Sequence, residues 1–183
     1  MPITAEGETR KPTPDEPPAL SGRWRVDPHA SHARFLATTL AGLVKTPGRF
    51  RALSGVLVVE EAHAAGALVI DSSSIDTGNR IRDRHLRSRD FFDVKRHPQL
   101  RYEAHSISSR DQGRARIDGE LIVADTRTPL PLNVTLRAPT DGVLELAYHA
   151  EVDRVALGIR GARGMVPRAV QLDVAITLRQ VIA

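Results

Sequence analysis

The sequence predicts an all-β domain of about eight antiparallel strands. Apolar residues recur at every second position over most of the chain, which is typical of strands that bury one face. Pairs and triplets of turn-forming residues separate many of these segments. Only one connector is long enough to hold a crossover, so consecutive strands are expected to pair in the antiparallel sense.

The first four strands are predicted near residues 24–37, 48–60, 66–75 and 99–108, where the alternation is less regular than it is later in the chain. Ala65-Gly66 is suited to a tight turn before the third of them. The fourth strand follows a long polar connector, residues 74–98. This connector is the one long interruption of the strand pattern.

The last four strands have the clearest alternation and are predicted at residues 114–123, 130–137, 144–153 and 170–179. In the first of these, Ala115, Ile117 and Leu121 alternate with charged residues. Tight turns are predicted at residues 111–113, Asp-Gln-Gly, and at Asp141-Gly142.

Eight strands with one apolar face can pack as a sandwich or close into a barrel. The presumed inner face carries mainly Leu, Val, Ile, Ala and Gly, and the whole chain has four Phe, two Tyr and one Trp. Small and medium aliphatic side chains fill a wide barrel poorly, so a closed barrel of this composition is expected to contain a cavity. A sandwich with a solid aliphatic core is the alternative.

The N-terminal segment differs in composition from the rest of the chain. Residues 1–21 contain five of the 12 prolines, and we predict a disordered tail there, followed by one domain over residues 22–183. The tail holds two of the 26 basic residues and four of the 22 acidic ones, which leaves the domain with a net charge of +6. A basic domain attracts phosphates, anionic lipid headgroups or nucleic acid, although an arginine-rich solvated surface explains the same charge.

The composition also excludes or disfavours several classes of protein. There is no cysteine, which excludes disulfides and thiol chemistry. No apolar run approaches the ~20 residues of a membrane helix, and the first 21 residues lack the pattern of a secretory signal. We therefore expect a cytoplasmic protein without stable membrane insertion. Nucleic-acid binding is not expected, because stacking aromatic residues are not interleaved with the arginines.

No motif for a catalytic nucleophile, a phosphate loop or a dinucleotide fold is present. His29 and His32 point to opposite faces of an extended segment, and no third ligand is evident. We therefore expect no metal site, no catalytic residue and no cofactor.

The connector, residues 74–98, is the strongest functional signal in the chain. Seven of the 17 residues from 80 to 96 are Lys or Arg, against three Asp. We predict a short helical segment around residues 78–93, capped by Asp76 or Thr77. The apolar residues would hold this segment on the barrel, and the arginines would face solvent or a ligand, since a guanidinium suits a phosphate. The predicted apolar anchors are Ile81, Leu86 and Phe91 or Phe92, and the arginines are Arg80, Arg82, Arg84 and Arg87.

The connector also resembles a known sequence signature, that of the YceI-like family. The resemblance rests on Asp76-Thr77-Gly78-Asn79, Arg82-Asp83, His85-Leu86-Arg87-Ser88, Asp90-Phe91-Phe92-Asp93-Val94 and Pro98. Other landmarks occur in the family's order over about residues 22–183: Trp24-x-Val26-Asp27, Ser31, Phe35, Gly48-Arg49-Phe50, Ser54-Gly55, Gly119-x-Leu121, Pro129, Arg154 and Gly158.

The resemblance implies an eight-stranded antiparallel lipocalin-like β-barrel that binds a polyisoprenoid or another long-chain lipid, and a homodimer. Three departures bear on the identity of the ligand. Ala30 stands where the family commonly has His, Ala124-Asp125 replaces a His-Gly pair, and Ala156-Leu157 stands where an acidic residue and an aromatic are usual.

We therefore predict that the barrel binds a long apolar ligand, such as a polyisoprenoid, an isoprenoid quinone or a fatty-acid-like lipid, for transport, storage or sequestration. The apolar cavity is expected to be lined by Phe35, Phe50, Leu68, Ile70, Tyr102, Leu121, Val123, Leu132, Val134, Leu146, Tyr148, Leu172 and Val174. A phosphate, quinone or amide head group would be bound by Asn79, Arg82, His85 and Arg87.

An enzyme that acts on a lipid-like metabolite in the same cavity is the alternative. His85 with Asp83 or Asp90 would then form an acid–base pair. The sequence indicates no reaction class for such an enzyme.

Overall fold

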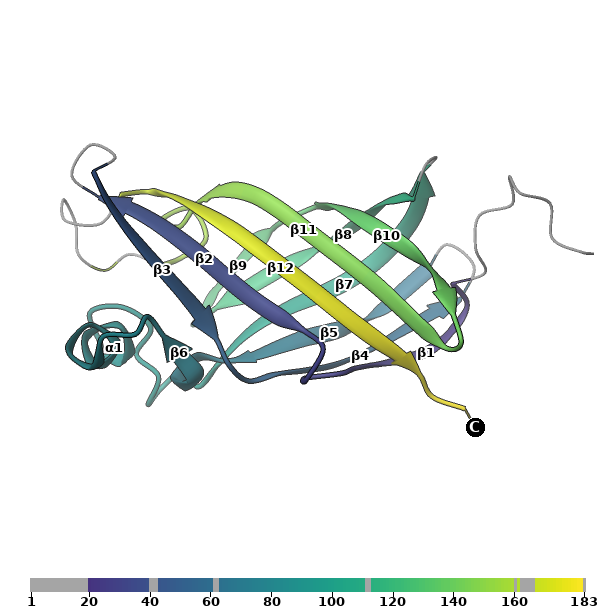
Figure 1. The fold of residues 1–183 in the computed structure, drawn as a ribbon, viewed down its shortest axis with the longest axis horizontal. Helices are drawn as coiled ribbons and strands as arrows, with labels where there is room; N and C mark the ends of the chain where they lie inside the picture. Colours follow the sequence, from purple (N-terminus) through teal and green to yellow (C-terminus); the bar gives the residue numbers. More distant parts are fainter. Residues whose placement is uncertain are drawn as a thin grey trace, which may run out of the picture.

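The structure, a computed structural model, describes residues 20–39, 43–60, 63–110, 113–159, 161 and 167–182. Its elements are shown in Figure 1. The strands are β1 (Gly22–Val26), β2 (His32–Thr39), β3 (Val44–Phe50), β4 (Leu53–Glu60), β5 (His63–Asp71), β6 (Ile75–Asp76), β7 (Gln99–Arg110), β8 (Arg114–Val123), β9 (Thr126–Pro129), β10 (Leu132–Thr140), β11 (Val143–Asp153) and β12 (Ala169–Gln180). A 3-10 turn, η1 (Ser72–Ser74), and one helix, α1 (Arg80–Arg87), lie between β5 and β7.

Eight of the strands form a closed ring in the order β1, β4, β5, β7, β8, β10, β11, β12, because β12 pairs back onto β1. All of these pairings are antiparallel. The predicted eight-stranded antiparallel barrel is therefore confirmed, and the sandwich alternative is wrong. No helix among the described residues is long and apolar enough to cross a bilayer.

The two N-terminal predicted strands are each interrupted by a bend. Residues 24–37 form β1 and β2, separated where the Asp27 carboxylate accepts hydrogen bonds from the backbone N–H groups of His29 and Ala30. Residues 48–60 belong to β3 and β4, separated where Ser74 Oγ accepts from the backbone of Arg51 and Ala52. These bends let β2 and β3 extend the wall beyond the ring at the end where α1 lies (Figure 1).

The predicted turn at Ala65-Gly66 is wrong, because both residues lie inside β5. Gly66 pairs with Leu57 on β4 and with Ala104 on β7. A Cβ atom at Gly66 would lie 2.2 Å from the carbonyl oxygen of Val56. The glycine therefore permits a close approach of two strands. The turn at Asp141-Gly142 is confirmed, with φ of 50° and 72° between β10 and β11.

Helix α1 is shorter than the predicted segment and begins at a different cap. The Asn79 side chain accepts hydrogen bonds from the backbone N–H groups of Ile81 and Arg82, at 3.0 and 3.1 Å. The prediction that Asp76 or Thr77 caps the helix is wrong, because Gly78, with a φ of 74°, turns the chain between them and α1. Residues 88–98 form turns and irregular backbone.

One end of the barrel is filled by a buried group that we call the Trp24 cluster. Trp24 is 1% exposed, and its indole N–H donates to the carbonyl of Leu20 at 2.9 Å. Leu20 is buried although we assigned it to the tail, Ser21 is exposed, and residues 1–19 of that predicted tail lie outside the described residues. The cluster comprises Leu20, Trp24, Val59, Ala64, Ile107, Ala115, Leu136 and Leu144.

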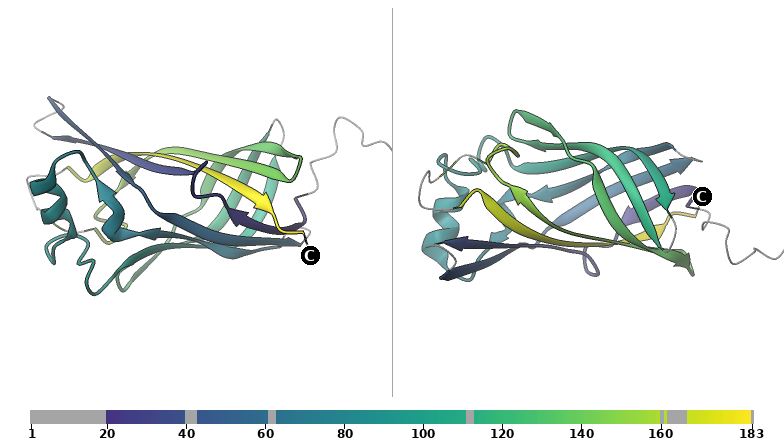
Figure 2. Two further views of the ribbon diagram at one scale, coloured as in Figure 1. Left: turned by 60° about the horizontal axis from the view of Figure 1, so that its bottom comes forward. Right: turned by 90° about the horizontal axis from the view of Figure 1, so that it is seen from above.

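The opposite end carries a second group, the phenylalanine cluster. The ring of Phe50 lies between those of Phe35 and Phe92, at centroid distances of 6.0 and 5.8 Å. The connector contributes to this cluster, as predicted, through Leu86, Phe91 and Phe92, but the fourth predicted anchor, Ile81, is 79% exposed. The cluster comprises Phe35, Phe50, Ile75, Leu86, Phe91, Phe92, Val94, Leu100, Val123 and Ile159. Figure 2 shows α1 and its connector across this end of the barrel.

Replacing Trp24 tests the closed end. We expect Trp24→Ala to lower the free energy of unfolding by about 3–5 kcal/mol, because it leaves a void in a packed cluster and removes a buried hydrogen bond. Urea denaturation followed by circular dichroism measures this change. Arg25→Ala, at an exposed neighbouring position, should change it by less than about 0.5 kcal/mol; equal effects of the two substitutions would contradict this view of the closed end.

Candidate ligand cavity

The interior of the barrel contains an apolar cavity of about 180 Å³. All eight strands of the closed ring contribute to its wall. Apart from Tyr102 and Tyr148, the lining side chains are aliphatic. The cavity therefore has the character of a site for a hydrocarbon.

Most of the predicted cavity residues line this space. They are Leu68, Ile70, Tyr102, Leu121, Leu132, Val134, Leu146, Tyr148, Leu172 and Val174. Phe35, Phe50 and Val123 do not line it but belong to the neighbouring phenylalanine cluster. Residues that sequence reasoning missed include Val26, Leu57, Ala104, Ile117, Leu130, Ile176 and Leu178. Ile117, Ile176 and Leu178 continue the same alternation, so the pattern contained the signal for them.

The exposure of inward-facing residues changes along the barrel. In the Trp24 cluster, Trp24, Val59 and Leu144 are at most 1% exposed. Around the cavity, Leu172 and Val174 face inward on β12 and are only half-buried. Well-packed protein interiors contain few voids of this kind. Leu172 and Val174 are only half-buried because they border the cavity, which no side chain of the described residues fills.

The volume of the cavity limits what the barrel holds as it stands. A cavity of about 150 Å³ lined by apolar side chains accepts a benzene-sized molecule, whereas pockets for drug-sized ligands measure about 300–1,000 Å³. At about 180 Å³, the cavity matches a short stretch of hydrocarbon. A longer chain requires the neighbouring side chains to move apart.

The two tyrosines on the cavity wall differ in their hydrogen bonding. The Tyr102 hydroxyl donates to the carbonyl of Leu130 at 3.0 Å, and the Ile117 carbonyl lies 3.3 Å away. Burial raises the pKa of Tyr102 and also that of Tyr148. The Tyr148 hydroxyl has no hydrogen-bond partner among the residues that the structure describes. Tyr102 therefore joins β7 to the segment between β9 and β10, and the Tyr148 hydroxyl is the polar group on the cavity wall that remains for a ligand.

Helix α1 divides its side chains into an inner and an outer face. Asp83, Leu86 and Arg87 are buried or half-buried, whereas Arg80 and Arg84 are exposed. A helical period of 3.6 residues separates the two sets in this way. The complete inner face is Arg82, Asp83, Leu86 and Arg87, and the complete outer face is Arg80, Ile81, Arg84 and His85.

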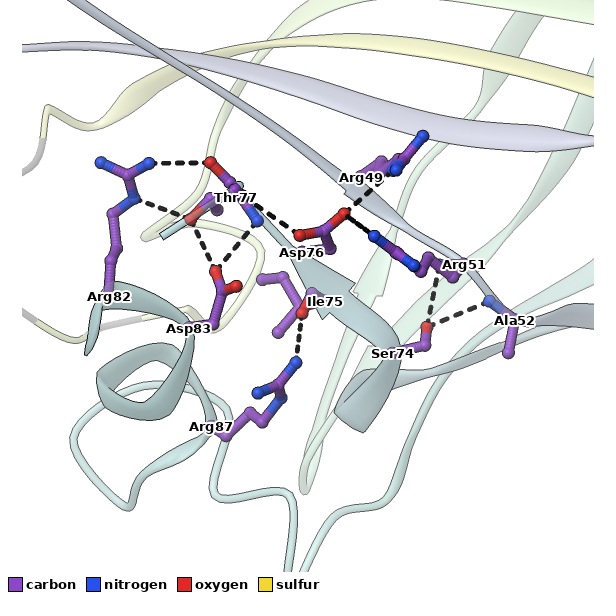
Figure 3. A network of polar contacts seen from close by, with 11 residues as sticks. Arg49, Arg51, Ala52, Ser74, Ile75, Asp76, Thr77, Arg82, Asp83 and Arg87 are labelled. Atoms are coloured by element: carbon purple, nitrogen blue, oxygen red, sulfur yellow. Dashed lines mark hydrogen bonds and ion pairs between the residues drawn. The ribbon is translucent and has the colours of Figure 1, made fainter. Parts of the chain in front are cut away.

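The inner face holds the connector together through Thr77. Asp83 is 6% exposed, and its carboxylate accepts from the backbone N–H and the hydroxyl of Thr77 at 2.9 and 2.6 Å. Arg82 donates through Nε to the hydroxyl and through Nη2 to the carbonyl of the same threonine (Figure 3). Two of the four predicted head-group residues, Arg82 and the cap residue Asn79, therefore make structural hydrogen bonds.

The other two predicted head-group residues have different surroundings. Arg87 donates to the carbonyls of Ser73 and Ile75, at 2.8 and 2.5 Å, and so ties α1 to the chain before it. The His85 ring is exposed and meets the ring of Phe91 edge-on at 5.4 Å. Among the described residues no carboxylate forms an ion pair with His85. The structure therefore does not bring together the acid–base pair on which the enzymatic alternative rests.

A second polar network anchors β6, at the start of the connector. Arg49 and Arg51 donate to one carboxylate oxygen of Asp76 at 3.1 and 2.6 Å (Figure 3). The hydrogen bond from Arg51, followed by that from the backbone N–H of Gly78, lowers the pKa of Asp76 to about 2. This network stabilises the strand from which the connector starts.

An open hollow of about 520 Å³ lies beside α1, where it is bordered by Arg80 and Arg84 of the outer face and by Asp83 and Arg87 of the inner face. Arg80 and Arg84 have no hydrogen-bond or ion-pair partner among the described residues. The arginines available to an external group are therefore these two rather than Arg82 and Arg87. The hollow is lined by Arg51, Ser74, Ile75, Asp76, Arg80, Asp83, Arg84 and Arg87.

Arg154 supports the phenylalanine cluster from the other side and was absent from the predicted site. It is 6% exposed, and it donates to the carbonyls of Pro167 and Ile159 at 2.9 and 2.6 Å. Its guanidinium carbon lies 6.0 Å from the ring centroid of Phe91. Burial lowers the pKa of Arg154. The residue joins the segment after β11 to the cover formed by the connector.

Comparison with known sequences identifies a domain family. The sequence model of the YceI-like domain matches residues 24–178. A UPF0312 protein of Ectopseudomonas mendocina is 28% identical over 117 residues, which is 61% of this chain and 61% of that protein. Protein YceI of Escherichia coli O157:H7 is 28% identical over 123 residues, 64% of this chain and 63% of that protein. The chain thus matches a little over three fifths of the length of these relatives.

Solved structures share the fold at low sequence identity. BcnA of Burkholderia cenocepacia has a TM-score of 0.74 and 19% identity, over 83% of this chain and 98% of that chain. A structure described as a polyisoprenoid binding domain from Saccharophagus degradans has a TM-score of 0.73 and 14% identity, over 86% of this chain and 98% of that chain. These similarities establish the barrel architecture.

The Asp76 network predicts a specific dependence of stability on pH. The folded-state pKa of about 2 lies below the ordinary value of 3.8, so the ionised carboxylate stabilises the fold above about pH 4, and this contribution disappears as the pH falls toward 2. We expect Asp76→Asn to lower the urea midpoint at neutral pH, and this difference from the native chain to shrink between about pH 4 and pH 2.

The matched control is Asp141→Asn, at an exposed turn position. This substitution should leave the urea midpoint nearly unchanged over the same range, because asparagine also adopts a positive φ readily. A deficit of Asp76→Asn that stays constant down to pH 2 would contradict the ionic origin of the effect.

Proposed function

The chain belongs to the YceI-like domain family, and from the cavity inside its barrel we propose that it binds a long apolar ligand of the polyisoprenoid, isoprenoid quinone or fatty-acid-like class. The observation that carries this proposal is a cavity walled by aliphatic side chains from all eight strands of the ring. The description of the related Saccharophagus degradans structure as a polyisoprenoid binding domain supports the same ligand class.

The affinity for such a ligand comes from burial of hydrocarbon. One methylene group transferred from water is worth about 0.8 kcal/mol, so a five-carbon isoprene unit contributes about 4 kcal/mol before the entropic cost of binding. The cavity of about 180 Å³ holds the inner part of the chain. The remainder lies toward the phenylalanine cluster, whose side chains must separate to admit it.

The ligand enters at the α1 end. The Trp24 cluster closes the other end with side chains that are at most 9% exposed. In the phenylalanine cluster, Phe35, Phe50 and Phe91 are only half-buried. The weaker packing of this cover makes it the lower-energy route to the cavity.

A polar head group then remains near α1 or at the Tyr148 hydroxyl. Of the residues that the sequence assigned to head-group binding, His85 is exposed on the outer face of α1. Asn79, Arg82 and Arg87 act as positioning residues because their polar groups bind the connector itself. Arg80 and Arg84 are the guanidinium groups that an anionic head group meets first. Transport, storage and sequestration are all consistent with reversible binding of this kind.

A pair of substitutions on β12 tests the cavity. Val174 faces inward and pairs with Tyr148, whereas its neighbour Ala175 faces outward and pairs with Ala147. We expect Val174→Phe to weaken binding of geranylgeraniol, a prenylated benzoquinone and palmitate at least tenfold, because the larger ring occupies space that the ligand needs. Titration of delipidated protein, followed by native mass spectrometry, measures the binding.

Ala175→Phe adds an aromatic ring to the outside of the same strand and should bind all three lipids as the native chain does. Circular dichroism and urea denaturation check that both variants fold. The proposed function would be refuted if the native chain bound none of the three probes. It would also be refuted if a folded Val174→Phe variant bound them as strongly as the native chain.

A further inference from the structure

Three of the four exposed large apolar residues in the described part of the chain lie at one end of the barrel. Leu43 is 85% exposed, Ile81 is 79% exposed and Val44 is 43% exposed. Leu43 and Val44 lie where the β2–β3 hairpin begins its second strand, and Ile81 lies on α1; Figure 1 shows both elements at the same end of the barrel. Ile182, which is 91% exposed, lies beside the C-terminus at the opposite end.

The exposure of Ile81 follows from the construction of α1. The inner face of the helix is occupied by Asp83, Leu86 and Arg87, which bind the connector and the phenylalanine cluster. Ile81 is therefore directed to the outer face, between Arg80 and Arg84. A single exposed isoleucine is common on protein surfaces, but here it shares one end of the molecule with a second exposed apolar segment.

Exposed basic side chains lie beside both apolar segments. Arg80 and Arg84 are exposed and have no partner among the described residues. Lys45 is exposed next to Val44. Two carboxylates near α1 are already satisfied, because Asp83 is buried against Thr77 and Asp76 is paired with two arginines. Asp90, after the helix, is exposed and is the acidic side chain that the surrounding cations outnumber. Further exposed basic residues follow in the connector at Arg89, Lys95 and Arg96.

Exposed apolar side chains flanked by cations match one partner in particular, the surface of an anionic bilayer. Apolar side chains enter the boundary between head groups and acyl chains, and arginine or lysine binds the phosphates and carboxylates above it. A protein groove for a folded partner would need a continuous apolar surface, whereas here two separated apolar points project from the end of a barrel.

We propose that the α1 end is a membrane-docking surface, in which Leu43, Val44 and Ile81 enter the interface of an anionic bilayer and Lys45, Arg80 and Arg84 bind its head groups. This proposal goes beyond ligand binding. It rests on the proposed function in one respect: docking would serve to exchange a lipid between the bilayer and the cavity. Docking at this end places the weaker cover of the cavity, the phenylalanine cluster, against the membrane.

Sedimentation with vesicles tests the docking surface. The full chain is mixed with vesicles of phosphatidylcholine alone or of phosphatidylcholine with phosphatidylserine, and the bound fraction is measured at low and high salt. We expect binding to the anionic vesicles that is at least tenfold stronger than to the neutral ones and that weakens as salt is added, because the charged part of the contact is screened. Equal binding to both vesicles, or none to either, would overturn the proposal.

Matched variants distinguish binding through this surface from nonspecific adsorption of the protein to vesicles. Leu43→Asp with Ile81→Asp should reduce binding to anionic vesicles at least tenfold, whereas Ile182→Asp, at the most exposed apolar residue of the other end, should leave it unchanged. Likewise, Arg80→Glu with Arg84→Glu should abolish the preference for phosphatidylserine. Arg23→Glu with Arg25→Glu makes the same change of charge on the exposed side of β1, and it should preserve that preference.

These measurements test the docking surface and the cavity independently, so either proposal can be refuted while the other stands. The variant Leu43→Asp with Ile81→Asp should still bind geranylgeraniol in solution, and Val174→Phe should still bind anionic vesicles. An equal loss of vesicle binding in Ile182→Asp and in the Leu43 and Ile81 variant would overturn the docking surface and leave the cavity proposal standing. Loss of lipid uptake in solution by a folded Leu43 and Ile81 variant would also overturn it, because these two residues would then act on the cavity.

Discussion

The pairing of β1 with β12 closes the ring of eight strands and so determines the interior of the molecule. β1 pairs with β4 on one side and with β12 on the other, so the eight strands have no free edge where they meet. Once the ring is closed, its width is set by the number and tilt of the strands and not by the side chains inside. Leu, Val, Ala and Gly then leave a cavity at mid-barrel, which an open sandwich would have removed by bringing its sheets together.

The same constraint makes the two ends of the barrel unequal. At one end, Trp24 and its neighbours supply enough volume to fill the ring, and Trp24 also joins Leu20 through a buried hydrogen bond. At the other end, β2 and β3 continue beyond the ring, and the opening is covered by Phe35, Phe50 and a connector from elsewhere in the chain. The closed end contributes stability, and the covered end is bounded by half-buried phenylalanine side chains.

The connector shows how one helix serves two purposes. Its inner arginines, Arg82 and Arg87, donate hydrogen bonds to backbone carbonyls of the connector. They satisfy acceptors that an irregular segment leaves without a backbone partner. Its outer residues, Arg80, Ile81 and Arg84, are left at the surface. A basic segment of this kind is both a structural clamp on the covered end and the part of the molecule that meets an approaching lipid surface.

By itself the sequence determined the all-β class, most strand positions, the short helix and most of the cavity wall, because an alternation such as that from Ala115 to Leu121 depends only on neighbours along the chain. Only the tertiary structure decided that Gly66 lies within a strand beside Val56, that Phe35, Phe50 and Val123 belong to the cover, and that Arg87 binds Ser73 and Ile75. Local periodicity shows which face of an element a side chain occupies. It does not show which distant segment packs against that face. That packing decides whether a polar side chain hydrogen-bonds within the fold or remains free to bind a ligand.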